Sequence, residues 1–496
     1  MTEGATLIYT SNPFVGGCPT ETLPGRRDAN ISGVILAIDG LTRANGPRAS
    51  VVIYPDRPSP WFFALSKQSR LDRSSTETMR SLLHTLAAAA IGSAGADAHP
   101  LIPRQGGGNN TIQCPPTPSP FPTWQQLPLQ SSLPDPFLPL QYTTPGDAAD
   151  VVAGRGEGRV KTPEEWYQCR QPEILHMLQE YQYGYYPDHG QETVQATRSG
   201  NTLSITVAAG GKTGRFSATV TLPSGASASK PAPVVINIGG MQNQAYLSAG
   251  IAVAQFDYTS VAPDSNAKTG AFWSIYNGRD IGVLTAWAWG FHRTLDAINM
   301  TVLEIDAGRV GVTGCSRLGK AALAAGLFDT RITLTMPMSS GVQGMGPYRY
   351  YSMSGQGENL ENSKQGAGWW TSSKLGAFIN HSENLPYDAH TIAAAIAPRA
   401  LVIDQGTGDQ FVNSKGTAVV IYPAAKVVYD WLGAGDKIAI SVRGGGHCDM
   451  SGFTSILPYV QKIFFGTPTS KDYNNLGSYG SPVTTAFPWG TAVPKA

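Results

Sequence analysis

The 496-residue chain has few charged residues and no excess of either sign. Charged side chains make up 14% of the sequence and the formal net charge is +1, so a strongly basic surface for nucleic acid is excluded. Apart from one short segment described below, no apolar run is long enough to cross a bilayer. With 41% hydrophobic residues, the composition predicts a globular protein with neither a nucleic-acid nor a membrane partner.

One apolar segment near the N-terminus has a different character. The run Met79–Ala98 starts with a basic residue, continues through Leu and Ala, and ends with the small residues Ala96 and Ala98. This order is typical of a secretory signal peptide, and the alternative is a buried helix. Because a signal peptide does not work from inside a chain, residues 1–78 are expected to be a non-native upstream extension. The segment therefore predicts a secreted, extracellular protein.

The rest of the chain divides by composition into three parts. Residues 99–140 form a Gly-rich linker and a proline-rich N-terminal arm, which cannot form regular helix and is expected to run extended over the surface. Residues 141–466 hold the ordered apolar pattern of the main domain. Residues 467–496, with many Gly, Pro, Ser and Thr, are expected to form a polar, loosely held tail.

Hydrophobic periodicity in the main domain predicts an α/β fold. Leu203–Val207 and Phe216–Leu222 alternate as an antiparallel pair does, whereas Pro233–Ile238 is a continuous apolar run typical of a buried parallel strand. Strands and helices then alternate, which predicts right-handed crossovers and a mostly parallel, twisted sheet with helices on both faces. The further expected strands are Ile251–Phe256, Val310–Thr313, Ile332–Met336, Ala400–Ile403 and Ile438–Val442, and the expected helices are Ile281–Ile298, Arg317–Leu327, Thr417–Leu432 and Phe453–Phe465.

The most informative motif follows the strand Val310–Thr313. There the chain passes through a glycine-flanked turn that contains Ser316 and enters an alanine-rich helix. Such a turn lifts a serine hydroxyl clear of the sheet and brings backbone N–H groups close enough to stabilise an oxyanion, so Ser316 is the candidate nucleophile. Gly314 precedes the serine by two residues, but Gly319 follows it by three. An ordinary glycine-bearing strand-to-helix turn is therefore the alternative.

His447 is the candidate general base. It lies in the segment Arg443–Asp449, directly after a late strand, where three glycines allow a sharp reversal of the chain. Catalytic groups in this architecture sit at the carboxyl ends of the strands, which is also where Ser316 is expected. Weaker candidates, each explained as well by burial in a helix, a sequon or capping, are His292, His381 and His390.

The candidate acid lies in the loop after the strand that starts at Ala400. Its sequence, Gly406–Val412, resembles the loop that carries the triad aspartate in many hydrolases, with Asp409 at the matching position. Asp409 would accept the Nδ1–H of the histidine, fix its tautomer and stabilise the imidazolium. Asp404, which is nearer the strand, is kept as the second candidate.

The cysteines agree with export. Setting aside Cys18, which lies in the upstream extension, leaves four, an even number that permits three pairings. Because Cys315 precedes the candidate nucleophile and Cys448 follows the candidate base, a bond between them would join two loops of the site. Cys114 and Cys169 would then fix the proline-rich arm. Sequons compatible with glycosylation are at Asn109, Asn299 and Asn380.

At these residues the sequence resembles a known family. Four strings together resemble the glucuronoyl esterases, carbohydrate esterase family 15: Gly314–Lys320, Thr285–Gly290, Ile396–Arg399 and Gly446–Cys448. The resemblance covers about Cys114–Gly466. It includes the surroundings of the first two of the four cysteines, where fungal members have a disulfide.

The resemblance implies a three-layer α/β-hydrolase that is a serine esterase. Its substrate would be the ester between 4-O-methyl-D-glucuronic acid of glucuronoxylan and the alcohols of lignin, and it would act as a monomer without a cofactor or metal. Ser316 would be the nucleophile, His447 the base, Arg317 the oxyanion stabiliser and Lys320 a donor to sugar hydroxyls. A guanidinium beside the nucleophile is a fixed donor for developing negative charge, which supports Arg317 on physical grounds.

The sequence also departs from the fungal members. They carry a catalytic glutamate where this chain has Ser339, and because serine supplies no carboxylate, Asp409 is expected to take over the role. Glu361 stands where fungal members use a glutamine to hold the uronate hydroxyls. Phe411 stands near the position of a family tryptophan, and both are expected to contact substrate.

Two other functions remain open at this point. One is a different esterase on the same fold, such as an acetyl xylan esterase, because a fold does not fix the substrate. The other is a glucuronoxylan-binding protein that has lost its chemistry, which the missing glutamate and the aromatic pair Trp369 and Trp370 suggest.

Overall fold

The computed structural model describes residues 51–52, 64–65, 112–143, 158–240, 242–350 and 357–494. The first 98 residues form a separate unit, in which strands β1 (Val51–Val52) and β2 (Ala64–Leu65) pair antiparallel. The rest of the expected extension and the expected signal peptide, residues 79–98, lie outside the described residues. No helix that the structure describes has the length and apolar character needed to span a membrane.

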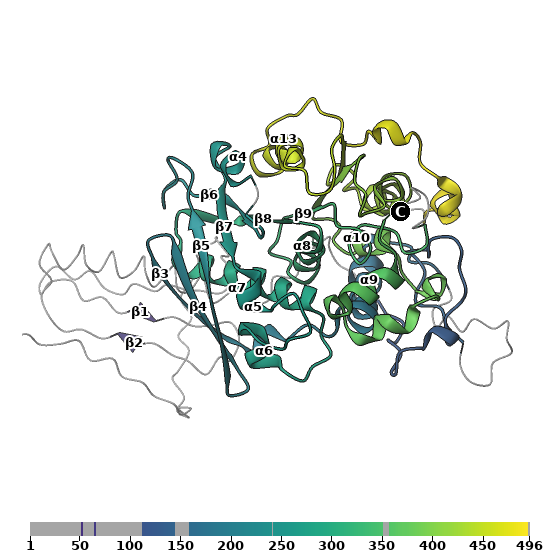
Figure 1. The fold of residues 1–496 in the computed structure, drawn as a ribbon, viewed down its shortest axis with the longest axis horizontal. Helices are drawn as coiled ribbons and strands as arrows, with labels where there is room; N and C mark the ends of the chain where they lie inside the picture. The colour runs from purple at the N-terminus through teal and green to yellow at the C-terminus, as the bar shows by residue number, and fades with distance from the viewer. Residues whose placement is uncertain are drawn as a thin grey trace, which may run out of the picture. The chain divides into compact units, whose positions relative to one another are not determined.

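A nine-stranded sheet occupies the centre of the described part of the second unit (Figure 1). Its strand order is β11-β10-β9-β8-β6-β7-β5-β4-β3. The six strands from β11 to β7 are parallel to their neighbours, and β5, β4 and β3 extend the sheet antiparallel. The bounds are β3 Thr193–Ser199, β4 Thr202–Ala209, β5 Lys212–Thr221, β6 Ala232–Asn237, β7 Ala252–Phe256, β8 Ile305–Cys315, β9 Leu334–Met338, β10 Ala400–Gly406 and β11 Ile438–Arg443.

The burial of each strand follows its place in the sheet. Every residue of β6, β9 and β10 is buried, because helices cover both faces of the parallel half. In β5, buried and exposed residues alternate from Gly214 to Thr221, because one face of the antiparallel half is open to solvent. The predicted continuous and alternating patterns are thus both confirmed.

Helices cover the two faces of the parallel half (Figure 1). On one face lie α4 and α13, whose Tyr246 and Phe453 join one buried apolar cluster with β6 and β9. On the other face α7, α8, α10 and α12 contribute to a second, larger cluster. This is the three-layer α/β arrangement that the sequence predicts. The bounds are α4 Asn243–Ser248, α7 Val283–Thr301, α8 Arg317–Phe328, α10 Ala389–Ala394, α12 Tyr422–Trp431 and α13 Ser451–Phe465.

Helix α7 is buried along almost its whole length, from Val283 to Ile298. It is rich in Ala and Trp on all sides, as expected for a helix enclosed by other elements. Gly290 lets it approach β7 closely, because a Cβ atom there would lie 2.6 Å from the ring of Phe256. The helix therefore fixes the spacing between the sheet and its helical layer.

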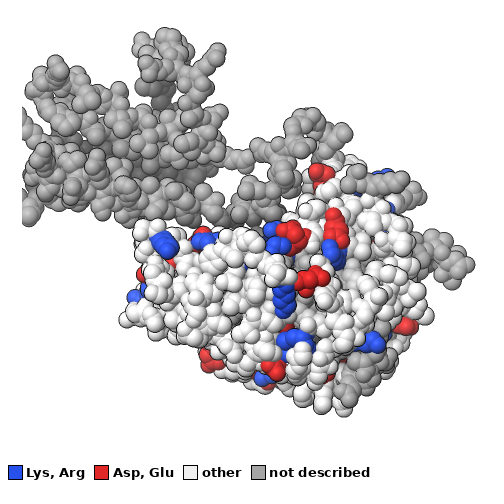
Figure 2. Space-filling view, turned by 90° about the horizontal axis from the view of Figure 1, so that it is seen from above, with Lys and Arg blue, Asp and Glu red and all other residues white. Residues whose placement is uncertain are grey.

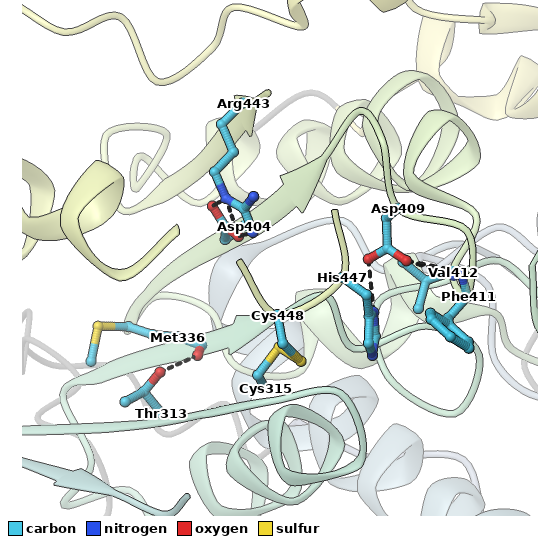
Figure 3. The surroundings of a disulfide bond; sticks show 10 residues. All are labelled: Thr313, Cys315, Met336, Asp404, Asp409, Phe411, Val412, Arg443, His447 and Cys448. Atoms are coloured by element: carbon cyan, nitrogen blue, oxygen red, sulfur yellow. Dashed lines mark hydrogen bonds and ion pairs between the residues drawn. A yellow bond between two sulfur atoms is a disulfide. The ribbon is translucent and has the colours of Figure 1, made fainter. Parts of the chain in front are cut away.

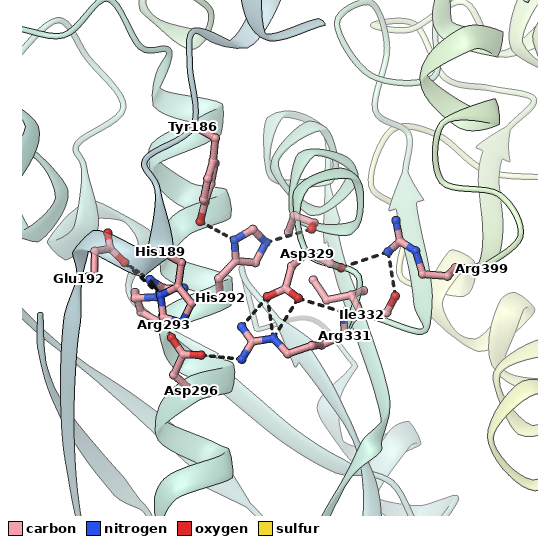
Figure 4. Close-up of polar contacts among 11 residues, drawn as sticks. Tyr186, His189, Glu192, His292, Arg293, Asp296, Asp329, Arg331, Ile332 and Arg399 are labelled. Atoms are coloured by element: carbon pink, nitrogen blue, oxygen red, sulfur yellow. Dashed lines mark hydrogen bonds and ion pairs between the residues drawn. The ribbon is translucent and has the colours of Figure 1, made fainter. Parts of the chain in front are cut away.

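Partly buried charged side chains connect the amino ends of neighbouring strands (Figure 4). Arg331, just before β9, forms ion pairs with Asp329 at 2.5 Å and with Asp296 of α7 at 2.6 Å. Arg399, just before β10, donates to the carbonyl of Asp329 at 3.1 Å. Charge-assisted bonds of this kind hold their partners in one geometry. These contacts lie at the amino ends of β9 and β10, whereas the candidate site lies at the carboxyl ends of the strands.

The proline-rich arm and the C-terminal tail are packed onto the domain. In the arm, Leu133 and Phe137 are buried, and the backbone N–H of Leu133 donates to the carbonyl of Ala486 in the tail at 2.7 Å. In the tail, Phe487 is buried and the indole of Trp489 donates to the carbonyl of Leu133 at 2.9 Å. Buried apolar side chains and backbone hydrogen bonds thus attach both segments to the domain, although most tail residues are exposed. Apolar residues spaced among prolines and glycines are buried here without forming regular helix or strand.

Candidate active site

Ser316 stands at a sharp turn between β8 and α8. Its backbone has φ 58° and ψ −130°, a conformation that L-residues rarely adopt and that marks a strained position. Its N–H donates to the carbonyl of Met338 in β9 at 2.9 Å, and its carbonyl accepts from the N–H of Lys320 at 3.0 Å. These bonds hold the strained turn between a strand and a helix, as expected for a nucleophile elbow.

Two glycines make the turn possible. A Cβ atom on Gly314 would lie 2.7 Å from the carbonyl oxygen of Leu318, and one on Gly319 would lie 2.8 Å from the carbonyl oxygen of Met338. Both contacts are with backbone atoms, which cannot move aside without shifting the helix or the strand. The second glycine is therefore needed three residues after Ser316, where α8 passes closest to β9.

His447 and Asp409 are hydrogen-bonded to each other (Figure 3). The Nδ1 atom of His447 lies 2.8 Å from Oδ2 of Asp409, whose side chain is fully shielded from solvent, whereas the histidine is 18% exposed. The other carboxylate oxygen accepts from the backbone N–H groups of Phe411 at 2.9 Å and Val412 at 3.2 Å. The carboxylate is thus fixed on one side by its own loop and directs its other oxygen to the imidazole.

These contacts determine the charge of Asp409. Burial by itself would raise its pKa, but the hydrogen bonds from His447 and from the N–H of Phe411 outweigh burial and hold the pKa below its ordinary value. The hydroxyl of Ser339, a fully buried residue after β9, also lowers the pKa of Asp409. The residue at the place of the fungal glutamate therefore lies near Asp409.

Asp404, the second candidate acid, has a different partner. Its carboxylate is fully buried and lies 2.9 Å from Nη2 and 3.1 Å from Nε of Arg443. Burial raises the pKa of Asp404 to about 6, although Arg443 opposes this shift. Figure 3 shows this pair and the pair of Asp409 and His447 as separate groups. The geometry therefore brings Asp409, and not Asp404, to the imidazole.

Both predicted disulfides are present. Cys315 and Cys448 are bonded, with their Cα atoms 5.7 Å apart, and so are Cys114 and Cys169. The first bond joins the residue before Ser316 to the residue after His447. The elbow and the histidine loop are therefore covalently linked, although they are far apart in the sequence.

In the described residues no hydrogen bond joins the hydroxyl of Ser316 to His447. The imidazole is instead held by Asp409 on Nδ1 and packs against the ring of Phe411, with ring centroids 5.0 Å apart. Bonds between nucleophile and base are often long in unliganded enzymes and shorten when substrate binds. The Cys315–Cys448 disulfide holds the segments that carry Ser316 and His447 next to each other. The hydrogen bond between the serine hydroxyl and the imidazole would form when substrate binds.

Arg317, the residue after Ser316, forms an ion pair with the carboxylate of Asp264. Its Nε lies 2.5 Å from Oδ2 of Asp264. The other oxygen of Asp264 accepts from the indole N–H groups of Trp369 at 2.8 Å and Trp370 at 2.7 Å. Asp264 lies in a loop between two short helices with no sequence motif, so no signal in one sequence could have identified it.

Lys320 is buried, with 1% of its side chain exposed. Its ammonium group donates to the carbonyls of Ser340 at 2.6 Å and Val342 at 2.7 Å, and to the carboxylate of Glu358 at 2.6 Å. Three acceptors use all three donors of a lysine. The expected donation to a sugar hydroxyl is therefore not available in this arrangement, because Glu358 occupies the outward position.

Glu358, rather than Glu361, faces the cavity beside Arg317. The cavity has a volume of about 310 Å³, and its lining includes Asp264, Arg317, Glu358, Asn362, Trp369 and Trp370. Glu361 is not among the lining residues, because its carboxylate accepts instead from the backbone N–H of Asn380 at 2.9 Å. The helix α9 (Leu360–Ala367) turns Glu361 away from this cavity.

Two of the other candidate histidines, His292 and His390, are buried in the core. His292 is buried between the hydroxyl of Tyr186 and the carbonyl of Ala325, and His390 is buried against the carbonyl of Pro134. Burial lowers the pKa of both histidines. Within the described ranges, no group of three or more His, Cys, Asp or Glu side chains is arranged to hold a metal ion.

The sequence is similar to those of known proteins. A family model described as "Glucuronyl esterase, fungi" matches residues 205–433, which include Ser316 and Asp409. The 4-O-methyl-glucuronoyl methylesterase of Podospora anserina is 35% identical over 350 residues, which cover 68% of this chain and 68% of that protein.

Solved structures are also similar. A carbohydrate esterase family 15 glucuronoyl esterase from Caldicellulosiruptor kristjansonii is 34% identical with a TM-score of 0.62, covering 69% of this chain and 93% of that one. A mutant of the Sporotrichum thermophile glucuronoyl esterase in complex with methyl 4-O-methyl-beta-D-glucopyranuronate is 27% identical with a TM-score of 0.61. That similarity covers 74% of this chain and 97% of the other.

Proposed function

Because the chain belongs to the glucuronoyl esterases of carbohydrate esterase family 15, we propose that Ser316, His447 and Asp409 form its catalytic triad. As a member of this family it is a carboxylic ester hydrolase with the α/β-hydrolase fold. The observation that carries the proposal is the hydrogen bond between Asp409 and His447 on a loop that Cys448 ties to the neighbour of Ser316.

The reaction is a two-step acyl transfer. His447 removes the proton of the Ser316 hydroxyl, which attacks the ester carbonyl, while Asp409 stays ionised and stabilises the imidazolium. The oxyanion is stabilised by the guanidinium of Arg317 and by backbone N–H groups at the start of α8; losing one such donor raises the barrier by about 3 kcal/mol. His447 then protonates the leaving alcohol, and water attacks the acyl-enzyme in the same way to release the acid.

The proposed substrate is the ester between 4-O-methyl-D-glucuronic acid of glucuronoxylan and an alcohol of lignin. A relative of similar fold has been solved with the methyl ester of the same uronic acid. The cavity beside Arg317 is lined by two tryptophans and by carboxylates, the side chains that commonly stack on sugars and accept from their hydroxyls. Lys320 would act through Glu358, whose carboxylate it orients.

We also propose that the protein is secreted, glycosylated and monomeric. The signal-like run Met79–Ala98 and the two disulfides support export, because disulfides persist in oxidising compartments. The sequons at Asn299 and Asn380 lie at exposed positions, as an attached glycan requires. N-terminal sequencing of the exported protein should find a start just after Ala98, and size-exclusion chromatography should give the mass of one chain.

The triad is tested with benzyl D-glucuronate as substrate. Ser316→Ala should abolish burst and turnover, and a fluorophosphonate should label the wild-type protein on Ser316 alone. Ser248→Ala, an exposed serine on α4, is the matched control and should keep full activity. Turnover that survives in Ser316→Ala would refute the proposal. Faster release of acetate from acetylated xylan than of benzyl alcohol from the uronate would point to an acetyl esterase.

A further inference from the structure

Two carboxylates and one cation line the cavity beside Arg317, and a second cation lies behind it, so that each cation pairs with one carboxylate. Arg317 and Asp264 form one pair, with Nε and Oδ2 2.5 Å apart. Lys320 and Glu358 form the other, with Nζ and Oε2 2.6 Å apart. Asp264, Glu358 and Arg317 all line the cavity, while Lys320 lies behind Glu358 and is buried. The charges near the reacting ester are therefore balanced.

The carboxylate of Asp264 contacts two tryptophans as well as Arg317. Its second oxygen accepts from the indoles of Trp369 and Trp370, so one ion pair and two N–H donors converge on the same carboxylate. Contacts of this kind fix the position of a carboxylate. The carboxylate of Asp264 is thus held in contact with Arg317.

Glu358 is fixed from the other side. The ammonium group of Lys320 also binds the carbonyls of Ser340 and Val342, so it cannot swing away from the carboxylate without leaving these two acceptors. Glu358 itself is 22% exposed, which leaves it facing the cavity. A space-filling view shows acidic and basic side chains side by side on one face of the molecule, rather than a patch of one sign (Figure 2).

The proposed reaction changes the charge of its substrate at this location. An uncharged uronate ester and water become an alcohol, a uronate carboxylate and a proton. A free guanidinium binds carboxylates strongly, often through two parallel hydrogen bonds. Without the two acidic residues, Arg317 and Lys320 would therefore attract the product more than the substrate. The carboxylates of Asp264 and Glu358 offset the attraction of the two cations for the product and repel the newly formed uronate.

We propose that Asp264 and Glu358 are specificity residues that make the cavity prefer the uncharged uronate ester over the free uronate. This inference rests on the proposed function, because it assigns the cavity to the acid part of the ester. The two residues reduce product inhibition without taking part in bond making or breaking.

The test measures binding to two matched ligands by calorimetry. One is the methyl glycoside of free D-glucuronate, which is an anion, and the other is the corresponding uronamide, which is neutral and has almost the same shape. The ratio of their dissociation constants is compared among the wild type, Asp264→Asn and Glu358→Gln. A ratio cancels a general loss of affinity, so a loosened cavity does not obscure the result.

Each substitution should shift the ratio in favour of the anion by about tenfold or more, which corresponds to about 1.4 kcal/mol. Asp264→Glu, which keeps the charge, should retain the wild-type ratio. Asp280→Asn, an exposed carboxylate that binds Ser373 outside the cavity, should also leave it unchanged. An unchanged ratio, or one shifted toward the uronamide, in either Asp264→Asn or Glu358→Gln overturns the inference for that residue.

Hydrolysis of benzyl D-glucuronate by the wild type is measured in parallel. If the wild type does not hydrolyse it, the proposed function fails, whatever the binding ratios are. If the wild type hydrolyses it and the ratios do not shift, the inference alone fails.

Discussion

The Nδ1 atom of His447 lies 2.8 Å from Oδ2 of Asp409, while the nearby Asp404 is bound to Arg443. Both aspartates come from the end of β10 or the loop that follows it, and both lie near a late strand. Only one of them can therefore set the tautomer of the imidazole. The two acids differ in partner and in pKa, which makes their roles separable by experiment.

Asp409→Asn should lower kcat on benzyl D-glucuronate by about 10³- to 10⁴-fold, because an amide neither fixes the tautomer nor stabilises the imidazolium. Asp404→Asn should change kcat less than about tenfold. Its effect on the free energy of unfolding should instead depend on pH as described below, because the carboxylate of Asp404 is buried against Arg443 and its pKa is raised. Steady-state kinetics and urea unfolding of both variants are the measurements. The reverse pattern would exchange the two assignments.

A carboxylate introduced at Ser339 should partly replace that of Asp409. Ser339 is fully buried after β9 and contributes to the lowered pKa of Asp409, so its side chain lies near that carboxylate. In the Asp409→Asn background, Ser339→Glu should restore about tenfold or more of the lost kcat, because a longer carboxylate from this position can reach Nδ1. Ser339→Gln in the same background has the same length but no charge and should restore nothing. Equal rates for the two double variants would contradict this geometry.

Much of the fold could be predicted because burial on both faces leaves a direct record in the sequence. The continuous apolar runs gave β6 and β10, and the alternating runs gave β4 and β5, within a few residues of their observed bounds. The strand β3 was missed because it is an edge strand, with exposed residues alternating with half-buried ones and no strong apolar pattern. The burial of the arm and tail was missed because irregular segments carry no period.

The three residues proposed as the triad could be selected from the sequence because each stands at a strand end in a recognisable motif. Cys315 and Cys448 were paired for the same reason, since each is next to a predicted catalytic residue. Asp264 and Glu358 were not predicted, because their importance comes only from contacts with distant residues. Glu361 was expected to contact substrate, but its carboxylate accepts from the backbone N–H of Asn380.

The lowered pKa of Asp409 predicts how the free energy of unfolding changes with pH. Because its folded pKa lies below the unfolded value of about 3.9, Asp409 stabilises the fold above that pH and loses this contribution as the pH falls through the folded pKa. The free energy of unfolding of the wild type minus that of Asp409→Asn should thus be constant above about pH 5 and shrink below about pH 4. A difference that grows on acidification would contradict the lowered pKa.

Asp404 should show the opposite dependence. Its folded pKa of about 6 lies above the unfolded value, so the folded state binds the proton more tightly. The free energy of unfolding of the wild type minus that of Asp404→Asn should therefore increase as the pH falls from about 7 to about 4. Chemical denaturation of both variants across this range gives the two slopes, and slopes of the same sign would show that one of the assigned environments is wrong.

The two disulfides should separate stability from catalysis. Cys114–Cys169 and Cys315–Cys448 close loops with sequence separations of 55 and 133 residues, so removing either should cost up to about 4–5 kcal/mol through the greater freedom of the unfolded chain. The double serine variant of Cys315 and Cys448 should also lose kcat, because the elbow and the histidine loop are no longer linked.

The double serine variant of Cys114 and Cys169 is the matched control, since it releases the arm and leaves the site intact. Thermal unfolding and kinetics well below the lower melting temperature compare them, and an equal loss of kcat in both variants would show that the inner disulfide positions nothing.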